Sequence, residues 1–269
     1  MRLKNAILFI IDPQVDFCDP NGKLYVKGAE KDISRLSNMI EKNMNEIDDI
    51  FVTLDSHHTI HIAHPIFWVN QKGEHPNPFT LITAEDVKKG IWRAYNPGYQ
   101  ARAETYVNTL EKNGRYVLCI WPPHCLIGSQ GATIMPELFA QLERWENQFA
   151  MVNMITKGSN LFTEHYSAVK ADVIDNNDNS TMLNAKLITT LQKCGPDQKI
   201  IISGEAMSHC VANTIRDTIQ EFSPEEAKKF IILEDASSNV TGFEYMGNDF
   251  LKEMVSKGVQ ISTTDKVFK

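Results

Sequence analysis

The stretch Ala6-Ile7-Leu8-Phe9-Ile10-Ile11-Asp12 is a run of apolar residues that ends in a carboxylate. Short, continuously apolar runs of this kind are typical of strands that are covered on both faces, as in a parallel sheet. Similar runs recur along the chain, and together they predict strands at residues 6–11, 50–54, 116–120, 151–155, 199–202, 230–233 and 259–263.

Helical patterns separate most of these strands. Ile33, Leu36, Ile40 and Met44 recur at helical spacing, and they predict a helix over residues 29–47. Further helices are predicted at residues 181–194, 208–222 and 242–257. Strands that alternate with helices imply right-handed crossovers. We therefore expect an α/β fold, a doubly wound, mostly parallel sheet of about six strands with helices on both faces in a Rossmann-like three-layer arrangement.

One long segment, at about residues 65–114, breaks this alternation. It contains four prolines, several aromatic residues and a helix-like run at residues 99–111, but no clear strand. A connection of this length is usually a functional lid or an insertion with its own structure. With no repeat or linker in the chain, we predict a single domain over residues 1–269 that carries this insertion.

Composition narrows the class of partner. The net charge is -7 and the pI is near 5.6, without the clustered Lys and Arg that nucleic-acid binding needs. The five cysteines are an odd number without paired spacing, which argues against a disulfide framework and a cysteine-based zinc site. No run resembles a signal peptide or a membrane span. We expect a cytoplasmic protein that acts on a small molecule, with no membrane or nucleic-acid partner and with homo-oligomers possible.

Five of the apolar runs stop at or near a residue that can do chemistry. These residues are Asp12, Asp55 with His57, His124, Lys157 and Cys210. The carboxyl ends of parallel strands meet at one edge of the sheet, and ligands bind in the crevice beyond that edge. Residues that are far apart in the sequence could therefore meet in one pocket.

Three of these residues could form a nucleophilic group. If Cys210 begins the helix that follows it, the helix dipole and the free N–H groups favour the thiolate. Lys157 precedes Gly158, which permits a sharp turn into a crevice. Asp12 would need a partner or a proton in its apolar surroundings. The alternatives are a small buried hydrophobe at Cys210 and a solvated lysine at Lys157.

The other three residues could hold a metal ion. Asp55 and His57 are two residues apart, so in an extended segment their side chains point to the same side. His124 follows two prolines that stiffen its loop. One Asp and two His would leave positions open for water or substrate, as catalytic sites do. Asp-x-His is also common at surfaces, and the nearby His58, His61 and His64 leave the choice of ligands open.

Taken in order, these motifs resemble those of the isochorismatase-like cysteine hydrolases, and among them most closely the nicotinamidases and pyrazinamidases. The segments are Asp12-Pro13-Gln14-Val15-Asp16-Phe17, Thr53-Leu54-Asp55-Ser56-His57 with His61, Trp121-Pro122-Pro123-His124-Cys125, Lys157-Gly158, and Gly204-Glu205-Ala206-Met207-Ser208-His209-Cys210-Val211. They cover nearly the whole chain outside residues 82–114.

The resemblance assigns roles to these positions. It implies a catalytic triad of Asp12, Lys157 and Cys210, and metal ligands Asp55, His57 and His124 for a divalent ion, usually zinc but sometimes iron or manganese. His61 matches a residue that is a ligand only in some members. Phe17 and Trp121 match aromatic residues that sandwich the substrate ring. The N–H groups of Ala206, after a cis peptide bond, and of Cys210 match the oxyanion hole.

The implied reaction is hydrolysis of nicotinamide, a small aromatic amide, to nicotinate and ammonia through a cysteine thioester. Several positions depart from the family pattern, namely Glu205, Ser208-His209, Glu164 and Ala63-His64, and the insertion could rebuild the pocket. Three alternatives stay open. They are another amidase or ureide hydrolase of the superfamily, a non-catalytic metabolite-binding homologue, and a zinc hydrolase with a metal-bound water as nucleophile.

Overall fold

A six-stranded parallel sheet forms the centre of the molecule, in the order β10-β9-β8-β1-β2-β7. The computed structural model describes residues 5–114 and 116–269. The strands are β1 (Ala6–Ile11), β2 (Ile47–Asp55), β7 (Asn153–Lys157), β8 (Lys199–Gly204), β9 (Phe230–Leu233) and β10 (Gln260–Ser262). The predicted α/β fold with a parallel sheet of about six strands is confirmed.

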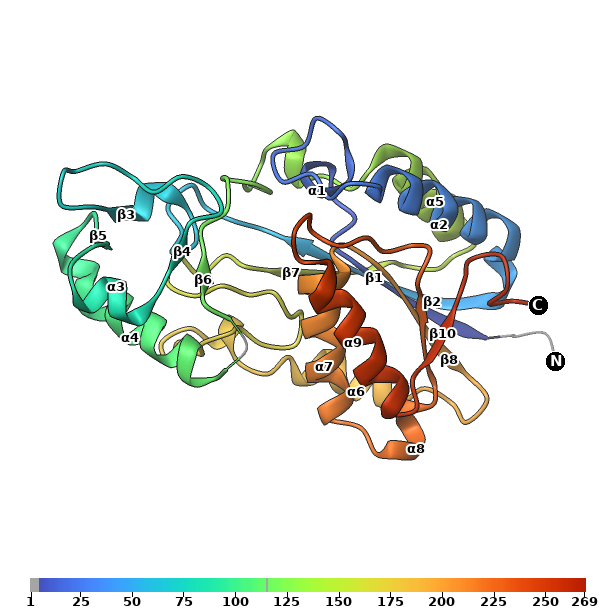
Figure 1. Ribbon diagram of the computed structural model, residues 1–269. Helices are drawn as coiled ribbons and strands as arrows, with labels where there is room; N and C mark the ends of the chain where they lie inside the picture. The colour runs from blue at the N-terminus through green and yellow to red at the C-terminus, as the bar shows by residue number, and fades with distance from the viewer. Residues whose placement is uncertain (1–4, 115) are drawn as a thin grey trace.

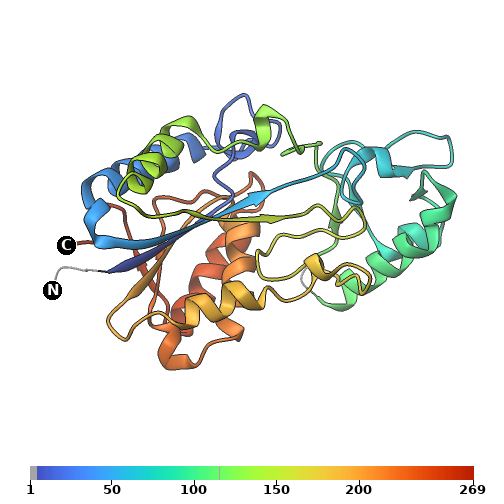
Figure 2. The ribbon, with the colours of Figure 1, turned by 180° about the vertical axis from the view of Figure 1, so that it is seen from behind.

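Helices cover both faces of the sheet (Figures 1 and 2). One layer contains α2 (Ala29–Asn43) and α5 (Pro136–Glu146), and the other contains α6 (Ala185–Gln192), α7 (Ala212–Gln220) and α9 (Glu244–Ser256). Successive side chains of β1 alternate between the two cores: Leu8 packs on the side of α2, whereas Phe9 packs on the side of α7. This double coverage explains why the run from Ala6 to Ile11 is apolar throughout.

The order of the strands places a switch point between β1 and β8. From β1 the sheet grows to β2 and β7 on one side and to β8, β9 and β10 on the other. Ile11 pairs with Gly204, and Asp55 pairs with Lys157, so β1 ends level with β8 and β2 ends level with β7. Ligands of doubly wound sheets bind at such a point, beyond the carboxyl ends of the strands.

The predicted strand at residues 116–120 does not belong to the main sheet, which corrects the expectation that all five runs feed its edge. Only Leu118–Cys119 (β6) is extended, and it pairs antiparallel with β4 (Leu81–Ile82). The N–H groups of Ile120 and Trp121 then donate to the carbonyls of Thr80 and Ala63. The run therefore satisfies its backbone in and beside the insertion, and His124 reaches the site from a loop.

The insertion has secondary structure of its own, beyond the carboxyl ends of the sheet strands (Figure 1). It contains two-residue strands β3 (Trp68–Val69), β4 and β5 (Arg93–Ala94), which the sequence did not reveal, and the helices α3 (Ala84–Lys88) and α4 (Gln100–Lys112). Its buried residues Trp68, Ile82 and Tyr106 join the same hydrophobic cluster as α2. We therefore propose that it belongs to the one predicted domain.

Helix boundaries differ from the predictions in several places. Helix α2 ends at Asn43 and a short turn follows, because Ile47 is already buried in β2 and pairs with Ala6. Helix α5 was not predicted, although Leu138, Leu142 and Trp145 show helical spacing. The remaining short helices are α1 (Val15–Cys18) and α8 (Pro224–Ala227). No helix among the described residues is long and apolar enough to cross a bilayer.

Candidate active site

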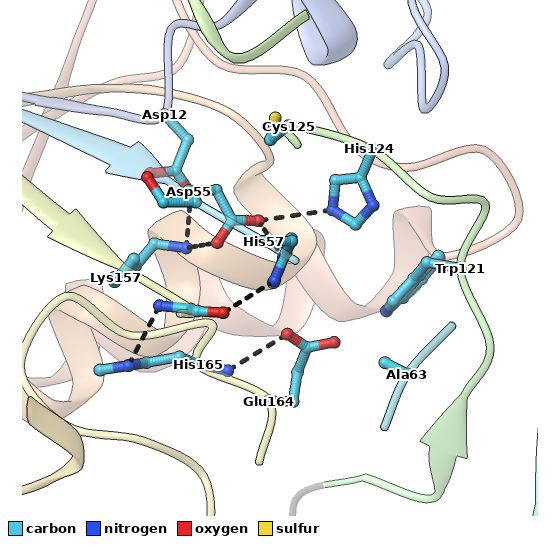
Figure 3. Close-up of polar contacts among 12 residues, drawn as sticks. Asp12, Asp55, His57, Ala63, Trp121, His124, Cys125, Lys157, Glu164 and His165 are labelled. Carbon is cyan, nitrogen blue, oxygen red and sulfur yellow. Dashed lines mark hydrogen bonds and ion pairs between the residues drawn. The ribbon is translucent and has the colours of Figure 1, made fainter. Parts of the chain in front are cut away.

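The structure brings Asp12, Lys157 and Cys210 together at the switch point. The ammonium nitrogen of Lys157 lies 2.8 Å from Oδ2 of Asp12, 3.2 Å from Oδ1 of Asp55 and 3.6 Å from Sγ of Cys210. All four side chains are buried, and Figure 3 shows Lys157 between the two carboxylates. The grouping expected from the strand ends is therefore present.

Cys210 lies in a π-helical turn, Met207–Val211, and helix α7 begins only at Ala212. The expectation of a thiolate at a helix start is wrong for this structure. Burial raises the pKa of the Cys210 thiol well above its ordinary value; Lys157 lowers it, and the charge of Asp12 raises it further. Burial thus favours the thiol over the thiolate, so the chemistry requires a proton acceptor nearby.

Asp12 is placed to be that acceptor. Burial raises the pKa of its carboxyl group, against the opposing effect of Lys157, so Asp12 is a stronger base than a solvated aspartate. Thr53 fixes its orientation, since the hydroxyl donates to Oδ1 at 2.5 Å and accepts the Asp12 N–H at 2.9 Å. No sequence pattern indicates this contribution by Thr53.

Asp55, His57 and His124 converge beside this group. Oδ2 of Asp55 lies 2.8 Å from Nε2 of His57 and 3.4 Å from Nε2 of His124. Each imidazole is oriented through Nδ1, which lies 3.0 Å from the carbonyl of Gly158 in His57 and 2.8 Å from the carbonyl of Pro122 in His124. Such outer contacts leave the Nε2 lone pairs for an ion.

The surroundings keep these ligands in place. Burial alone would raise the pKa of Asp55, but His57 and Lys157 outweigh it and hold the pKa well below its usual range. The side-chain amide of Gln14 donates to the Asp55 carbonyl and accepts its N–H, both at 2.7 Å. A Cβ atom at Gly158 would lie 2.6 Å from Oδ1 of Asp55. One carboxylate and two imidazoles thus form a preorganised donor set that suits zinc and similar ions.

His61, the ambiguous ligand, does not join this donor set. Its ligand atom instead groups with those of His57 and Glu164, within 4.8 Å of one another, and all three residues are buried. His64 is also buried and its ring centre lies 5.1 Å from that of His61. The sequence did not single out Glu164 as a member of this cluster, although it marked Glu164 as a departure from the family pattern.

Aromatic side chains line the other side of the site. The ring of Phe17 meets His124 at 5.2 Å between centroids. Trp121 donates its ring N–H to the hydroxyl of Tyr166 at 2.8 Å and packs edge-on to His209 at 5.4 Å. His209, one of the departures from the family pattern and the residue before Cys210, thus lies among aromatic rings. Of the two residues expected to stack on the substrate, Phe17 thus lies against His124 and Trp121 against His209.

The loop before Cys210 has the predicted cis peptide bond, between Glu205 and Ala206. The carbonyl of Ala206 accepts the N–H groups of His209 and Val211, and the Glu205 N–H donates to Ile11 at the end of β1. This network fixes Ala206 relative to the sulfur of Cys210. An oxyanion hole formed by the amides of Ala206 and Cys210 remains a prediction.

Glu205 gives a testable pH dependence. Burial raises the pKa of its carboxyl group well above the usual value, and Asp32 adds to the effect, while the N–H of Ser238 donates to Oε2 at 3.0 Å. The folded protein therefore holds a proton that the unfolded chain loses above about pH 4.5. Stability from this group is present below that pH and declines as the pH rises toward the folded-state pKa.

We expect Glu205→Gln, which resembles the protonated carboxyl group, to flatten that decline. Urea unfolding of both proteins at pH 5 and pH 8 measures it. The wild type should lose more free energy of unfolding between the two pH values than the variant does. Parallel pH dependences in the two proteins would contradict a protonated Glu205.

Comparisons with known proteins agree with this fold. No family model matches the chain. The nicotinamidase of Saccharomyces cerevisiae is 25% identical over 207 residues, which are 77% of this chain and 78% of that protein. A nicotinamidase/pyrazinamidase structure from Acinetobacter baumannii superposes with a TM-score of 0.65 at 22% identity and covers 98% of both chains. This chain has the fold of the nicotinamidases.

The pyrazinamidase of Pyrococcus horikoshii, whose structure was solved in complex with zinc, extends the likeness. Its TM-score is 0.55 at 20% identity, over 96% of this chain and 99% of that one. The resemblance inferred from the ordered motifs is thus supported by both sequence and structure. The buried set of Asp55, His57 and His124 is consistent with a divalent metal in this chain as well.

Proposed function

We propose that this protein is a metal-containing cysteine amidohydrolase that converts nicotinamide to nicotinate and ammonia. The observation that carries the proposal is the bridging position of Lys157, which contacts Asp12, Asp55 and Cys210 at once. A nucleophile with its proton acceptor and a set of metal ligands thereby share one buried cluster. The similarity to nicotinamidases supports this substrate over other amides.

Asp12, Cys210 and Ala206 have distinct roles in the proposed reaction. Asp12 takes the proton of the Cys210 thiol, and the sulfur forms a bond to the amide carbon. The amides of Ala206 and Cys210 stabilise the oxyanion, an interaction worth about 3 kcal/mol for each donor. The C–N bond then breaks, the proton on Asp12 goes to the departing ammonia, and a thioester remains. A water molecule hydrolyses the thioester to the carboxylate and restores the thiol.

Lys157 keeps this cluster electrostatically stable. It compensates Asp12 and Asp55, and it favours the thiolate once Asp12 has accepted the proton. Phe17 and Trp121 would hold the pyridine ring. Asp55, His57 and His124 would hold the divalent ion, with zinc as our first choice and iron or manganese as alternatives. When bound, the ion supplies a Lewis acid that can fix the pyridine nitrogen.

A second candidate is hydrolysis of a different small amide. The half-exposed Phe79 of the insertion meets Trp121 edge-on at 5.8 Å, so the insertion contributes a ring beside the residue expected to stack on substrate. A panel of amides separates the candidates. Turnover of non-aromatic amides with nicotinamide inert would favour the second.

Removal of the ion tests the first candidate directly. We expect the protein to release ammonia from nicotinamide, to lose this activity after treatment with a chelator, and to regain it when zinc is restored. The physical reason is that Asp55, His57 and His124 would hold the ion, which would supply a Lewis acid beside the substrate. Ammonia release that is insensitive to chelation, after metal analysis shows that the ion is gone, would contradict this role.

A further inference from the structure

The proposed reaction assigns no role to two buried polar residues, Glu164 and His61. Their side chains are 4% and 1% exposed. Oε1 of Glu164 accepts only the adjacent N–H of His165, at 3.2 Å, and Oε2 has no hydrogen-bond partner among the described residues. Burying a carboxylate without a partner costs free energy, so we expect a cation or a hydrogen-bond donor near this oxygen.

The buried ammonium group of this site already has two carboxylate partners. Lys157 contacts Asp12 and Asp55, and no ion pair involves Glu164 in the part of the chain that the structure describes. Asp12 and Asp55 therefore share the ammonium group of Lys157, and the Glu164 carboxylate, which groups with His57 and His61, is left without a cation. A divalent cation would neutralise this carboxylate.

The ligand geometry is also present. Ligand atoms of His57, His61 and Glu164 lie within 4.8 Å of one another, and Figure 3 shows the Glu164 carboxylate directed toward His57. Both nitrogens of His61 have contacts at 3.2 Å, to the Thr163 carbonyl and the Ala63 N–H, at the long end of the hydrogen-bond range. An ion would replace one weak contact. A second unpartnered buried atom, Nε2 of His64, belongs to a ring 5.1 Å from His61.

We propose that His57, His61 and Glu164 form a second position for a divalent cation, next to the position formed by Asp55, His57 and His124. Two imidazoles and one carboxylate are again a donor set that suits zinc. This second position depends only on these three side chains, so the proposal does not rest on which substrate the protein hydrolyses.

The two positions are filled alternately. They share His57, and a neutral imidazole offers a lone pair on only one of its two nitrogens. In the structure Nε2 of His57 faces Asp55 and Nδ1 faces the Gly158 carbonyl. One ion per chain is therefore expected, even when the second position is intact.

A pair of variants tests this arrangement by zinc affinity, measured by competition with a chromophoric chelator. His124→Asn removes a ligand from the first position only, so this variant should still bind one zinc ion per chain. Adding Glu164→Gln should weaken that residual binding by more than the roughly 100-fold that loss of an outer contact can cost. The matched control adds Glu205→Gln, a change at another fully buried glutamate, and should leave zinc affinity as it is in His124→Asn.

If the wild type binds zinc but His124→Asn does not, or if Glu164→Gln weakens residual binding no more than Glu205→Gln does, the second position is overturned and the first stands. A wild type that binds no zinc would overturn both positions. Thermal unfolding of the metal-free variants checks folding. If Glu164→Gln does not fold, His61→Gln on the His124→Asn background replaces it, with the same loss expected.

Discussion

Replacement of Cys210 by alanine should lower ammonia release from nicotinamide by about 10⁴-fold or more, the scale on which loss of a nucleophile acts in other covalent hydrolases. The sulfur is the atom that forms the thioester in the proposed reaction. Steady-state ammonia release measures the loss. Substrate binding should persist, because the ring contacts and the ion ligands are untouched.

Cys194→Ala is the matched control for this variant. Cys194 is also a buried free cysteine of the same core layer, but it precedes the amino end of β8, where its sulfur contacts the Gln198 carbonyl at 3.4 Å. Its activity should match that of the wild type. Full activity in Cys210→Ala would contradict the thioester route and favour a metal-bound water as the nucleophile. Wild-type protein with no activity on any amide would favour a binding function.

The sequence predicted the sheet well because a doubly covered parallel strand has a distinct pattern. The run from Ala6 to Ile11 is apolar at every position, since alternate side chains enter two cores. The same logic placed Asp12 and Lys157 at one edge. It was wrong for residues 116–120, where an equally apolar run pairs with the insertion. Hydrophobic periodicity shows which residues of a strand are buried, but it does not show which strand pairs with it.

The candidate site was less predictable where tertiary contacts decide it. Spacing could align Asp55 with His57, but it could not choose between His61 and His124 as the third ligand. That choice depends on the loop that follows Trp121. The raised pKa of the Cys210 thiol could not be predicted from the sequence either. It is caused by burial in the folded protein, which the position of Cys210 in the chain does not reveal. Thr53 and Gln14 act through hydrogen bonds that leave no sequence pattern.

Replacement of Lys157 by methionine should have the largest effect on stability. Lys157 is the cation between Asp12 and Asp55, and the three side chains are 1%, 0% and 5% exposed. Removing one partner of a buried ion pair leaves an uncompensated charge and costs about 3–5 kcal/mol. We expect a loss of this size in urea unfolding at pH 7, measured with a chelator present so that a bound ion does not compensate the carboxylates. Amide hydrolysis should also be lost.

The double variant separates charge from packing. Adding Asp12→Asn to Lys157→Met removes one of the two unpaired carboxylates, so part of the lost stability should return while activity stays absent. The two changes are then non-additive, as expected for residues in one network. Lys252→Met is the control, because its partner Asp249 lies 3.3 Å away at the exposed surface, where an ion pair contributes little. If Lys157→Met unfolds at the same urea concentration as this control, the carboxylates do not carry the charges assigned to them, and Asp12 is not the base that the proposed reaction requires.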